Sequence, residues 1–466
     1  MTHTVILGAG ISGLYTGFRL AEKGGHHVTL LEKTASVGGM AKAMPYGQYK
    51  LDFGPHKIYS VLPGILDEYQ RFMDNTLITV EKKNSIFLDG KRIQFPINPV
   101  KAPFQISPWN IAKCGFGFVG ASIKKMLAPK KIQTYEDYFL TGFGKPSYDL
   151  LFRDLALKVW GDPKQLTEEL ARKRVPVPNL ITLATSAFKS KPTLSAKHFL
   201  YPPGGFGAVF ETLKRKIERM DGKVLLETTP TMLRLENNQV TRVEYIRGTK
   251  KGIIRNPDYV VSTIHIQDTL NLFSPRPPKH VLDAASRLKW RGLVLVFVFC
   301  DKERILDENW TFFPERKYIF NRISEPKSQS ESVAPKGKSY IIAEVTLDPE
   351  DPLFSDEQRI TERVLEDLVK AKVIKREDVK ETLVKKARRV YPIYDLHYRA
   401  NLITILRWMD SIKNFFSIGR PGLFNYNNTD HCIDTGMKLA DTIIAGGRMD
   451  DWIEVRKSFN EYSIID

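Results

Sequence analysis

TVILGAGISGLYTGFRLAEKG, residues 4–24, is the stretch that decides the fold. An apolar run over residues 4–7 predicts a buried strand, and glycines then follow at the spacing G-x-G-x-x-G. Apolar residues from Leu14 onward recur at helical spacing until two consecutive glycines end the helix at Gly24. A strand, a glycine-rich turn and a helix in this order predict a Rossmann-type unit that binds a dinucleotide.

Each glycine of this turn has its own expected role. Gly8 permits the tight turn, Gly10 lets backbone approach a pyrophosphate, and Gly13 lets the helix pack closely on the strand. The helix N-terminus at Ile11 and Ser12 offers free N–H groups and partial positive charge to phosphates.

The residues after this unit indicate which cofactor it binds. A second strand over residues 28–33 ends with Glu32, which is expected to accept hydrogen bonds from a ribose, and with Lys33. Gly38 and Gly39 follow, and they resemble the second glycine motif of flavoproteins with two dinucleotide-binding domains, which carry FAD rather than NAD. Many relatives with that motif have Arg after the glycine pair, where this chain has Met40.

We expect the FAD to be held noncovalently, because no Cys or His lies in a recognisable flavin-attachment motif. The three cysteines are scattered and predict neither a disulfide framework nor a metal site.

Length and charge limit the class of protein. A chain of 466 residues is long enough for two or three domains around a large core. Its 70 Lys and Arg against 53 Asp and Glu give a net charge of +17, which favours anionic partners. Nothing resembles a nucleic-acid-binding motif, so no nucleic acid is expected as a partner.

The sequence predicts a cytoplasmic protein with one candidate membrane contact. The first strand begins at Thr4, which leaves no room for a signal peptide, and no apolar run is long enough to span a membrane. Within residues 103–131, however, apolar side chains interleave with lysines. This segment predicts either an amphipathic helix at the inner face of the membrane or a core-facing helix with a solvated lysine face.

The order of the remaining segments predicts an α/β fold with inserted domains. Its expected parts are a discontinuous Rossmann-like FAD-binding domain (1–98, 200–270 and 400–466), a mainly helical domain (99–199) and a mixed-sheet substrate domain (271–399). A hairpin signal at residues 85–97, with Asp89-Gly90 at its turn, ends the first cofactor segment. The polar residues 324–339 predict a mobile loop.

Three further segments predict side chains beside the cofactor. Gly54, Pro55 and His56 form a rigid turn that either sets the imidazole at the flavin N5 edge or is a purely structural turn. The last helix, capped by Thr429 or Asp430, is expected to direct its N-terminus at the flavin and stabilise negative charge there. A third segment either walls a pocket or ends a strand; its residues are Tyr391, Tyr394, His397 and Tyr398.

Taken together, these motifs are similar to those of the amine-oxidase and protoporphyrinogen-oxidase-like superfamily of FAD proteins. Several resemble the UDP-galactopyranose mutase branch of that superfamily. GPHKIYS resembles its flavin-facing histidine loop, and KVWG resembles a pocket motif that contains Trp160. FNRISEPK resembles a strand whose arginine, here Arg322, contacts a substrate diphosphate. GRPGLFNYNNTDH resembles the closing FAD segment, with Arg420 at the flavin and Tyr426 at the substrate.

One motif departs from the mutase pattern. RVPVPN matches the R-x-P-x-R arrangement at Arg174, but Pro178 stands where the second, phosphate-binding arginine is expected. The resemblance therefore implies a flavoenzyme of this group whose substrate need not be UDP-galactose.

The motifs and the resemblance assign site residues to three roles. Residues expected in catalysis are His56, Arg322 and Tyr426. Residues expected to bind FAD are Gly8, Gly10, Ile11, Ser12, Gly13, Glu32, Lys33, Gly38, Gly39, Met40, Gly54, Pro55, His56, Gly419, Arg420, Asn428 and Asp430. Residues expected at the substrate are Trp160, Arg174, Arg322, Tyr391 and Tyr426.

The expected activity is that of an FAD-dependent oxidoreductase in glycan or nucleotide-sugar metabolism, acting on a small anionic substrate such as a nucleotide sugar or a lipid-linked glycan. Two alternatives stay open at this point. One is a mutase-like isomerase that uses reduced FAD without net redox change. The other is a basic binding protein that keeps a flavin as a structural element.

Overall fold

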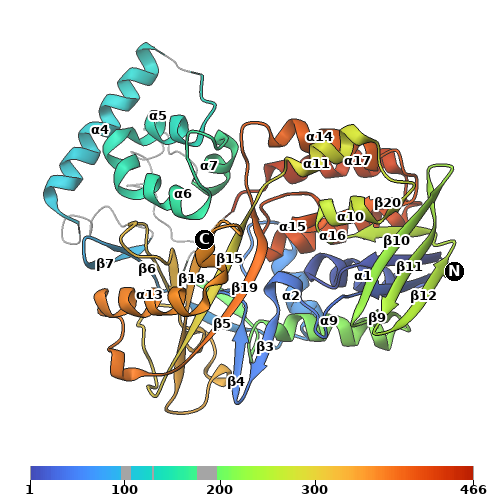
Figure 1. The fold of residues 1–466 in the computed structure, drawn as a ribbon, viewed down its shortest axis with the longest axis horizontal. Helices are drawn as coiled ribbons and strands as arrows, with labels where there is room; N and C mark the ends of the chain where they lie inside the picture. The colour runs from blue at the N-terminus through green and yellow to red at the C-terminus, as the bar shows by residue number, and fades with distance from the viewer. Residues whose placement is uncertain (1, 96–105, 129–130, 176–196, 465–466) are drawn as a thin grey trace.

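The computed structural model describes residues 2–95, 106–128, 131–175 and 197–464. Its central sheet has five parallel strands in the order β20-β13-β1-β2-β9. These strands are β1 (Thr2–Leu7), β2 (His26–Leu31), β9 (Lys223–Leu225), β13 (Tyr259–Ser262) and β20 (Phe415–Ser417). The sheet lies on the N-terminal side of the molecule (Figure 1), and it confirms the predicted Rossmann-type α/β fold.

The two faces of this sheet bury alternate residues of β1, as the two-residue period of a strand requires. Ile6 packs into a core that includes residues of α1 (Ile11–Lys23), α9 (Gly207–Arg219) and α16 (Thr429–Ile444). Val5 and Leu7 belong to a second core on the opposite face. The central strand is thus buried from both sides, which fixes the turn that follows it.

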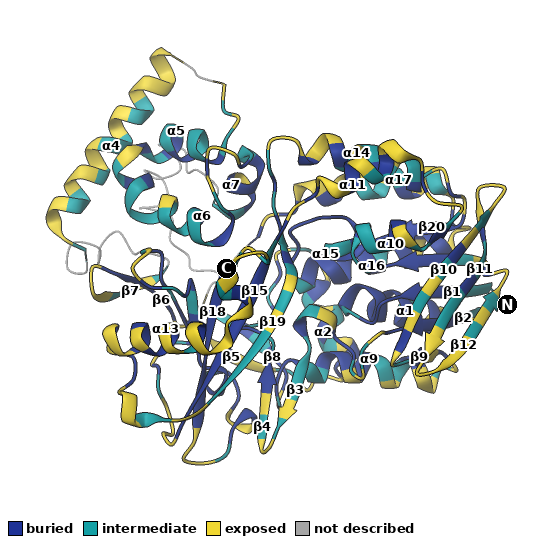
Figure 2. Cartoon of the chain, viewed as in Figure 1, coloured by how far each residue is buried: buried dark blue, intermediate teal, exposed yellow. Residues whose placement is uncertain are grey.

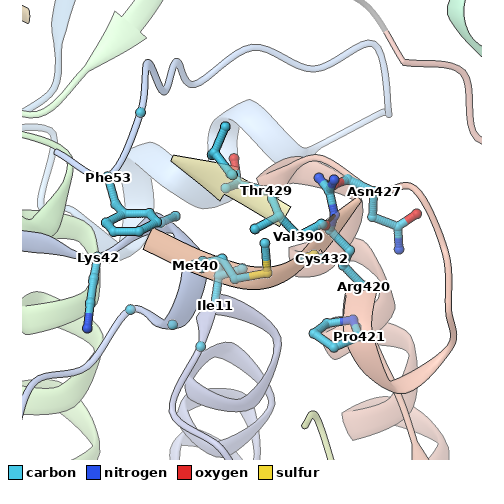
Figure 3. Close-up of a pocket in the computed structure, with 18 of the residues that line it drawn as sticks. Ile11, Met40, Lys42, Phe53, Val390, Arg420, Pro421, Asn427, Thr429 and Cys432 are labelled. Atoms are coloured by element: carbon cyan, nitrogen blue, oxygen red, sulfur yellow. Dashed lines mark hydrogen bonds between the residues drawn. The ribbon is translucent and has the colours of Figure 1, made fainter. Parts of the chain in front are cut away.

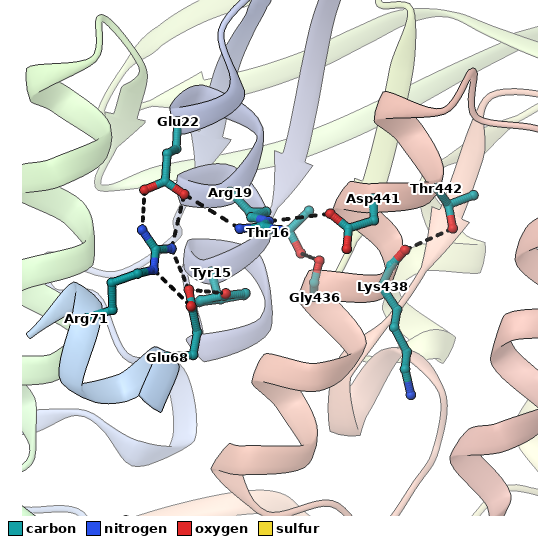
Figure 4. Close-up of polar contacts among 10 residues, drawn as sticks. All are labelled: Tyr15, Thr16, Arg19, Glu22, Glu68, Arg71, Gly436, Lys438, Asp441 and Thr442. Atoms are coloured by element: carbon teal, nitrogen blue, oxygen red, sulfur yellow. Dashed lines mark hydrogen bonds and ion pairs between the residues drawn. The ribbon is translucent and has the colours of Figure 1, made fainter. Parts of the chain in front are cut away.

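Helix α1 is tied to its neighbours by polar side chains (Figure 4). Arg71 of α2 (Ile65–Phe72) pairs with both Glu22 and Glu68. On the other side, Arg19 Nε lies 3.4 Å from Asp441 Oδ1 of α16. Such exposed pairs contribute little stability each, so their main effect is to fix how the helices align.

A four-stranded sheet and several helices cover the second face of the central sheet. Its strands are β10 (Thr228–Glu236), β11 (Gln239–Arg247), β12 (Lys250–Arg255) and β14 (Phe273–Ser274). The covering helices are α10 (Ile266–Leu272), α11 (Lys279–Ser286) and α14 (Tyr398–Met409). The boundary predicted at residue 270 therefore falls too early, because β14 and α11 still pack with the Rossmann-type sheet.

A second part of the molecule is built on a seven-stranded mixed sheet in the order β19-β15-β18-β17-β16-β6-β7. Its strands are β6 (Asn84–Leu88), β7 (Lys91–Phe95), β15 (Trp290–Cys300), β16 (Trp310–Phe312), β17 (Arg322–Ser324), β18 (Ser339–Leu347) and β19 (Val379–Pro392). One face is covered by α13 (Glu357–Lys370), and the other contacts residues of β3 (Ala43–Tyr46) and β4 (Tyr49–Asp52).

Two expectations for this region are wrong. The hairpin predicted within the cofactor segment 1–98 forms as expected at Asp89-Gly90, but β6 pairs with β16 and so extends the seven-stranded sheet. Residues 324–339, predicted to be a mobile loop, are packed down, because the buried Glu325 carboxylate accepts hydrogen bonds from the backbone N–H groups of Ile305 and Leu306. The polar composition of residues 324–339 led to the prediction of a mobile loop, and composition does not reveal which polar side chains become buried and hydrogen-bonded.

The helical region comprises the residues described between β7 and β8 (His198–Tyr201), within the segment predicted as a mainly helical domain, 99–199. Its helices are α4 (Pro108–Leu127), α5 (Tyr135–Ser147), α6 (Arg153–Val159) and α7 (Glu168–Arg174). The remaining elements are β5 (Ile78–Glu81), β8 (His198–Tyr201), α12 (Pro352–Ser355), α15 (Gly419–Gly422) and α17 (Met449–Lys457). No described helix is long and apolar enough to cross a membrane.

Helix α4 contradicts the expectation of a core-facing helix. It stands at the outer edge of the molecule, and Figure 2 shows it mostly exposed along its length. None of its residues is buried, and Phe116 is 80% exposed. Its apolar side chains therefore face solvent.

Candidate functional site

The glycine-rich turn has the geometry of a phosphate-binding turn. Gly8 has φ +97°, and a side chain there would lie 2.6 Å from Thr263 Oγ1. A Cβ on Gly13 would lie 2.2 Å from the Gly8 carbonyl oxygen, so this glycine packs beneath the turn. At Gly10 the nearest atom to an added Cβ is Gly39 Cα, at 3.9 Å. The space beside Gly10 is thus left open for a ligand.

The second glycine pair and the acid lie against this turn. Gly38 donates its N–H to the Ala9 carbonyl at 2.8 Å. Glu32 accepts from the Ala9 N–H at 2.9 Å and from the Thr34 N–H at 2.9 Å, one on each carboxylate oxygen. These bonds hold the carboxylate at the end of β2, where its remaining lone pairs face the cavity beside the turn.

A cavity of about 910 Å³ begins at this turn and is lined from the Rossmann-type sheet, the seven-stranded sheet and the helical region. Figure 3 shows Ile11, Met40, Phe53 and Arg420 along it. Every predicted site residue except Gly13 lines the cavity. Gly13 does not, because it is packed under the Gly8 carbonyl.

His56 reaches the cavity from the loop after β4. Its ring lies 4.9 Å from the Phe206 ring, and its Nε2 is shielded from solvent and has no hydrogen-bond partner within the part of the chain that the structure describes. Burial, with Arg322 and Arg420 nearby, lowers the pKa of His56 to about 4. The imidazole is therefore neutral at pH 7.

A buried network that the sequence did not reveal holds this loop. The Asp52 carboxylate accepts from the Tyr201 hydroxyl and from the Phe206 N–H, the latter at 3.0 Å. Burial raises the pKa of Asp52 to about 6. Because Phe206 also contacts the His56 ring, Asp52 fixes both the loop and the ring beside it.

Arginines and aromatic rings alternate at the far side of the cavity. The Arg174 guanidinium lies 5.5 Å from the rings of both Trp160 and Tyr426. The Arg420 guanidinium lies 4.5 Å from the Tyr426 ring and 5.1 Å from the Tyr391 ring. Arg420 also donates from Nε to the Val390 carbonyl and from Nη1 to the Asn427 carbonyl, at 3.2 Å each. Rings and backbone together therefore orient its guanidinium.

Arg322 occupies the same wall, but its pairing differs from the expected diphosphate contact. Its Nε donates to Glu344 Oε1 at 2.6 Å, and its Nη2 donates to Oε2 at 3.0 Å. Glu344, on the neighbouring strand β18, is 1% exposed. This carboxylate offsets the charge of Arg322.

The start of α16 also lines the cavity. The helix begins one residue earlier than expected, because Asn428 is the N-cap and its N–H donates to His431 Nδ1 at 3.1 Å. Asp430 instead accepts from the Ser60 hydroxyl at 2.8 Å. The sequence prediction missed Asn427, whose buried amide has no partner among the described residues although it lines the cavity.

Two other expectations have a mixed outcome. Of the aromatic cluster at the end of β19, Tyr391 lies within the strand and lines the main cavity. Tyr394 and Tyr398 line a second, smaller pocket, and His397 is exposed. Pro178, at the position of the second arginine, lies outside the described residues.

The pKa of His56 predicts how stability changes with pH. Since the unfolded side chain titrates near 6.5 and the folded one near 4, the unfolded state binds more protons between these values. This contribution, about 3 kcal/mol, is complete above pH 6.5 and is lost as the pH falls toward 4. Urea unfolding of the flavin-free protein should show a smaller loss over this range for His56→Phe than for wild type. The exposed His397→Phe should match wild type, and equal losses in all three would contradict the assignment.

The fold and the cavity define a class: a Rossmann-type dinucleotide-binding fold with a helical region and a seven-stranded mixed sheet inserted between its segments. Residues 6–75 match the family model of an NAD(P)-binding Rossmann-like domain. A 1-hydroxycarotenoid 3,4-desaturase from Flavobacterium sp. (strain P99-3) is 39% identical over 75 residues, which are 16% of this chain and 15% of the desaturase.

Solved structures extend the likeness to almost the whole chain. The structure of a reduced UDP-galactopyranose mutase matches with a TM-score of 0.80 and 18% identity, over 96% of this chain and 94% of the mutase. The cyclohexylamine oxidase from Brevibacterium oxydans IH-35A matches with a TM-score of 0.65 and 14% identity, over 95% of this chain and 99% of the oxidase. The chain therefore has the fold that the mutase and the amine oxidase share, and the predicted resemblance in fold is confirmed.

Proposed function

We propose that this chain is an FAD-dependent oxidoreductase of the amine-oxidase and protoporphyrinogen-oxidase-like group. The observation that carries the proposal is a cavity that starts at a glycine-rich phosphate turn and is lined by residues with buried polar atoms that have no partner among the described residues. Among those atoms are His56 Nε2, Arg420 Nη2 and the amide of Asn427. Buried polar groups are normally satisfied, so such a set indicates a ligand.

The residues present fit a flavin dinucleotide. The open space beside Gly10 suits the pyrophosphate, the α1 N-terminus suits its charge, and Glu32 suits the ribose. The α16 N-terminus, at Asn428, would lie at the ring end, with Arg420 beside it. When bound, a flavin supplies the capacity to accept or donate a hydride.

Noncovalent binding is part of this proposal. Cys432 lines the cavity, but burial raises the pKa of its thiol, which disfavours the reactive thiolate. Acid precipitation should therefore release the flavin into the supernatant.

The chain's own groups would position the substrate and handle protons. Neutral His56 presents Nε2 as an acceptor, held in place by Phe206 and Asp52. Burial raises the pKa of Tyr391, so its hydroxyl stays protonated near neutral pH and can donate a hydrogen bond. The Tyr426 hydroxyl is a second donor on the same wall of the cavity. The surrounding aromatic rings exclude water, which strengthens each polar contact made inside.

We propose an anionic substrate, a nucleotide sugar or a lipid-linked glycan being the expected kinds. Arg174 and Arg420 bring two positive charges to the cavity wall around the Tyr426 ring, and this charge would attract a bound anion. Arg322 contributes less net charge, because Glu344 offsets it.

A second candidate, an isomerase of the mutase type, is favoured by one observation. The TM-score against the mutase, 0.80, exceeds the 0.65 found against the cyclohexylamine oxidase. The two candidates differ in whether the flavin changes oxidation state over a complete reaction.

Anaerobic assays separate them. The reduced protein is incubated with UDP-galactose and UDP-galactofuranose, and the oxidised protein with candidate amine and alcohol reductants. Bleaching of the oxidised flavin by a substrate supports the oxidoreductase. Exchange between the two sugars without net change in flavin absorbance would replace it with the isomerase.

His56→Ala should keep the flavin bound and lower turnover by at least about a hundredfold, the lower range for loss of a positioned proton-transfer group. The flavin content is measured on the same preparation as the turnover, which is assayed with the substrate identified in the anaerobic assays. Unchanged turnover would show that His56 has a purely structural role.

A further inference from the structure

The outer face of α4 is a continuous apolar surface. We define this outer face by Trp109, Ala112, Phe116, Val119, Ile123 and Met126, which are spaced alternately three and four residues apart and so lie on one side of the helix. Its large side chains are solvent-exposed, with Trp109 at 67% and Met126 at 76%. Isolated exposed apolar residues are ordinary, whereas a contiguous row of them marks an interaction surface.

The opposite side of α4 is fixed to the protein. A Cβ on Gly117 would lie 2.6 Å from Pro146, and a Cβ on Gly144 would lie 2.3 Å from the Gly117 carbonyl oxygen. Near the start of the helix, Asn110 donates to Asp89 at 3.3 Å. This close crossing with α5 leaves no freedom for α4 to turn its outer face inward, so the apolar surface is held toward solvent.

The charges beside the outer face indicate which kind of partner it binds. Helix α4 contains no acidic residue, and it carries Lys113, Lys124 and Lys125. Lys113 Nζ lies 4.9 Å from the Trp109 ring, at the edge of the apolar row. A second copy of the chain would bring lysines against lysines with no acid on either helix to offset them, whereas an anionic surface would be attracted.

We propose that the outer face of α4 docks the protein on the surface of an anionic lipid bilayer. A helix of 20 residues, about 30 Å long, would lie in the plane of the interface. Its apolar row would enter the acyl region, while the lysine side chains extend back to the lipid phosphates. The inference goes beyond the proposed function, since it concerns a surface outside the cavity.

The test is co-sedimentation of the flavin-loaded protein with phosphatidylcholine vesicles, with and without phosphatidylglycerol. Wild type should bind the vesicles that contain phosphatidylglycerol, and the tryptophan emission should shift to shorter wavelength in a way that Trp109→Phe removes. The double variant Phe116→Asp/Ile123→Asp should bind more than tenfold less. Lys113→Gln/Lys124→Gln should lose the preference for the anionic vesicles.

The matched control is Ile403→Asp, which places the same charge on an exposed isoleucine of α14 and should bind as wild type does. Circular dichroism and flavin content verify that each variant is folded. Wild type that sediments with neither vesicle overturns the proposal, as does a double Asp variant that binds as tightly as wild type. A third result would also overturn the proposal: wild type does not bind vesicles but forms dimers in light scattering, and only the double Asp variant abolishes these dimers. That result would assign the outer face of α4 to contact with a second copy of the chain.

Discussion

Gly10→Val should abolish flavin binding while the protein stays folded. The backbone at Gly10 is extended, with φ −74° and ψ 177°, which any residue adopts, and an added Cβ meets no atom closer than 3.9 Å. The valine would instead occupy the space proposed for the pyrophosphate. Loss of two charge-assisted hydrogen bonds, at about 1.5–3 kcal/mol each, corresponds to at least a hundredfold loss of affinity.

The measurement is a titration of the flavin-free variant with FAD, with circular dichroism as the measure of folding. Gly120→Val is the matched control, because Gly120 lies on α4 with open space around it and far from the cavity. Gly13→Val should differ from both: its side chain meets backbone 2.2 Å away, so it disturbs the fold itself. If the Gly10→Val protein bound FAD with wild-type affinity, the assignment of this turn as the phosphate-binding site would be wrong.

Arg322→Ala should destabilise the folded protein by about 3–5 kcal/mol, the usual cost of removing one partner of a buried ion pair. The reason is Glu344, which is 1% exposed and would be left as an uncompensated carboxylate. Urea unfolding with FAD in equal excess measures the free energy of unfolding of variant and wild type.

Two variants make this result specific. Arg388→Ala removes an arginine whose partner Glu350 is 84% exposed, and it should cost less than about 1 kcal/mol. The double variant Arg322→Met/Glu344→Leu removes both charges and should recover most of the lost stability. If Arg322→Ala cost no more than Arg388→Ala, the pair with Glu344 would have no structural role.

The dinucleotide-binding part of the fold could be predicted because its signals are local. Gly8, Gly10 and Gly13 are close in the sequence. Gly8 has a positive φ, and a Cβ on Gly13 would meet the Gly8 carbonyl oxygen within the same turn. The hairpin at Asp89-Gly90 was predictable for the same reason, since both turn residues have positive φ. Its assignment to a sheet was not, because pairing of β6 with β16 joins residues more than 200 positions apart.

The site was predicted less completely where partners come from distant strands. The resemblance of motifs named Arg322, but nothing in the sequence around it indicated Glu344 on β18. Likewise, the network of Asp52 with Tyr201 and Phe206 depends on tertiary contacts across about 150 residues of chain. For α4, the pattern of apolar and basic residues predicted a helix. Which side of that helix faces the protein could not be predicted, because it depends on the close packing of Gly117 against Pro146.

The central claim is that the cavity beginning at Gly10 holds FAD. The most direct measurement is the visible absorption spectrum of the purified protein, followed by acid precipitation and chromatographic identification of what is released. If the cavity holds FAD, the protein is yellow and releases one FAD per chain into the supernatant. A colourless protein that contains no FAD and does not bind added FAD would contradict this assignment.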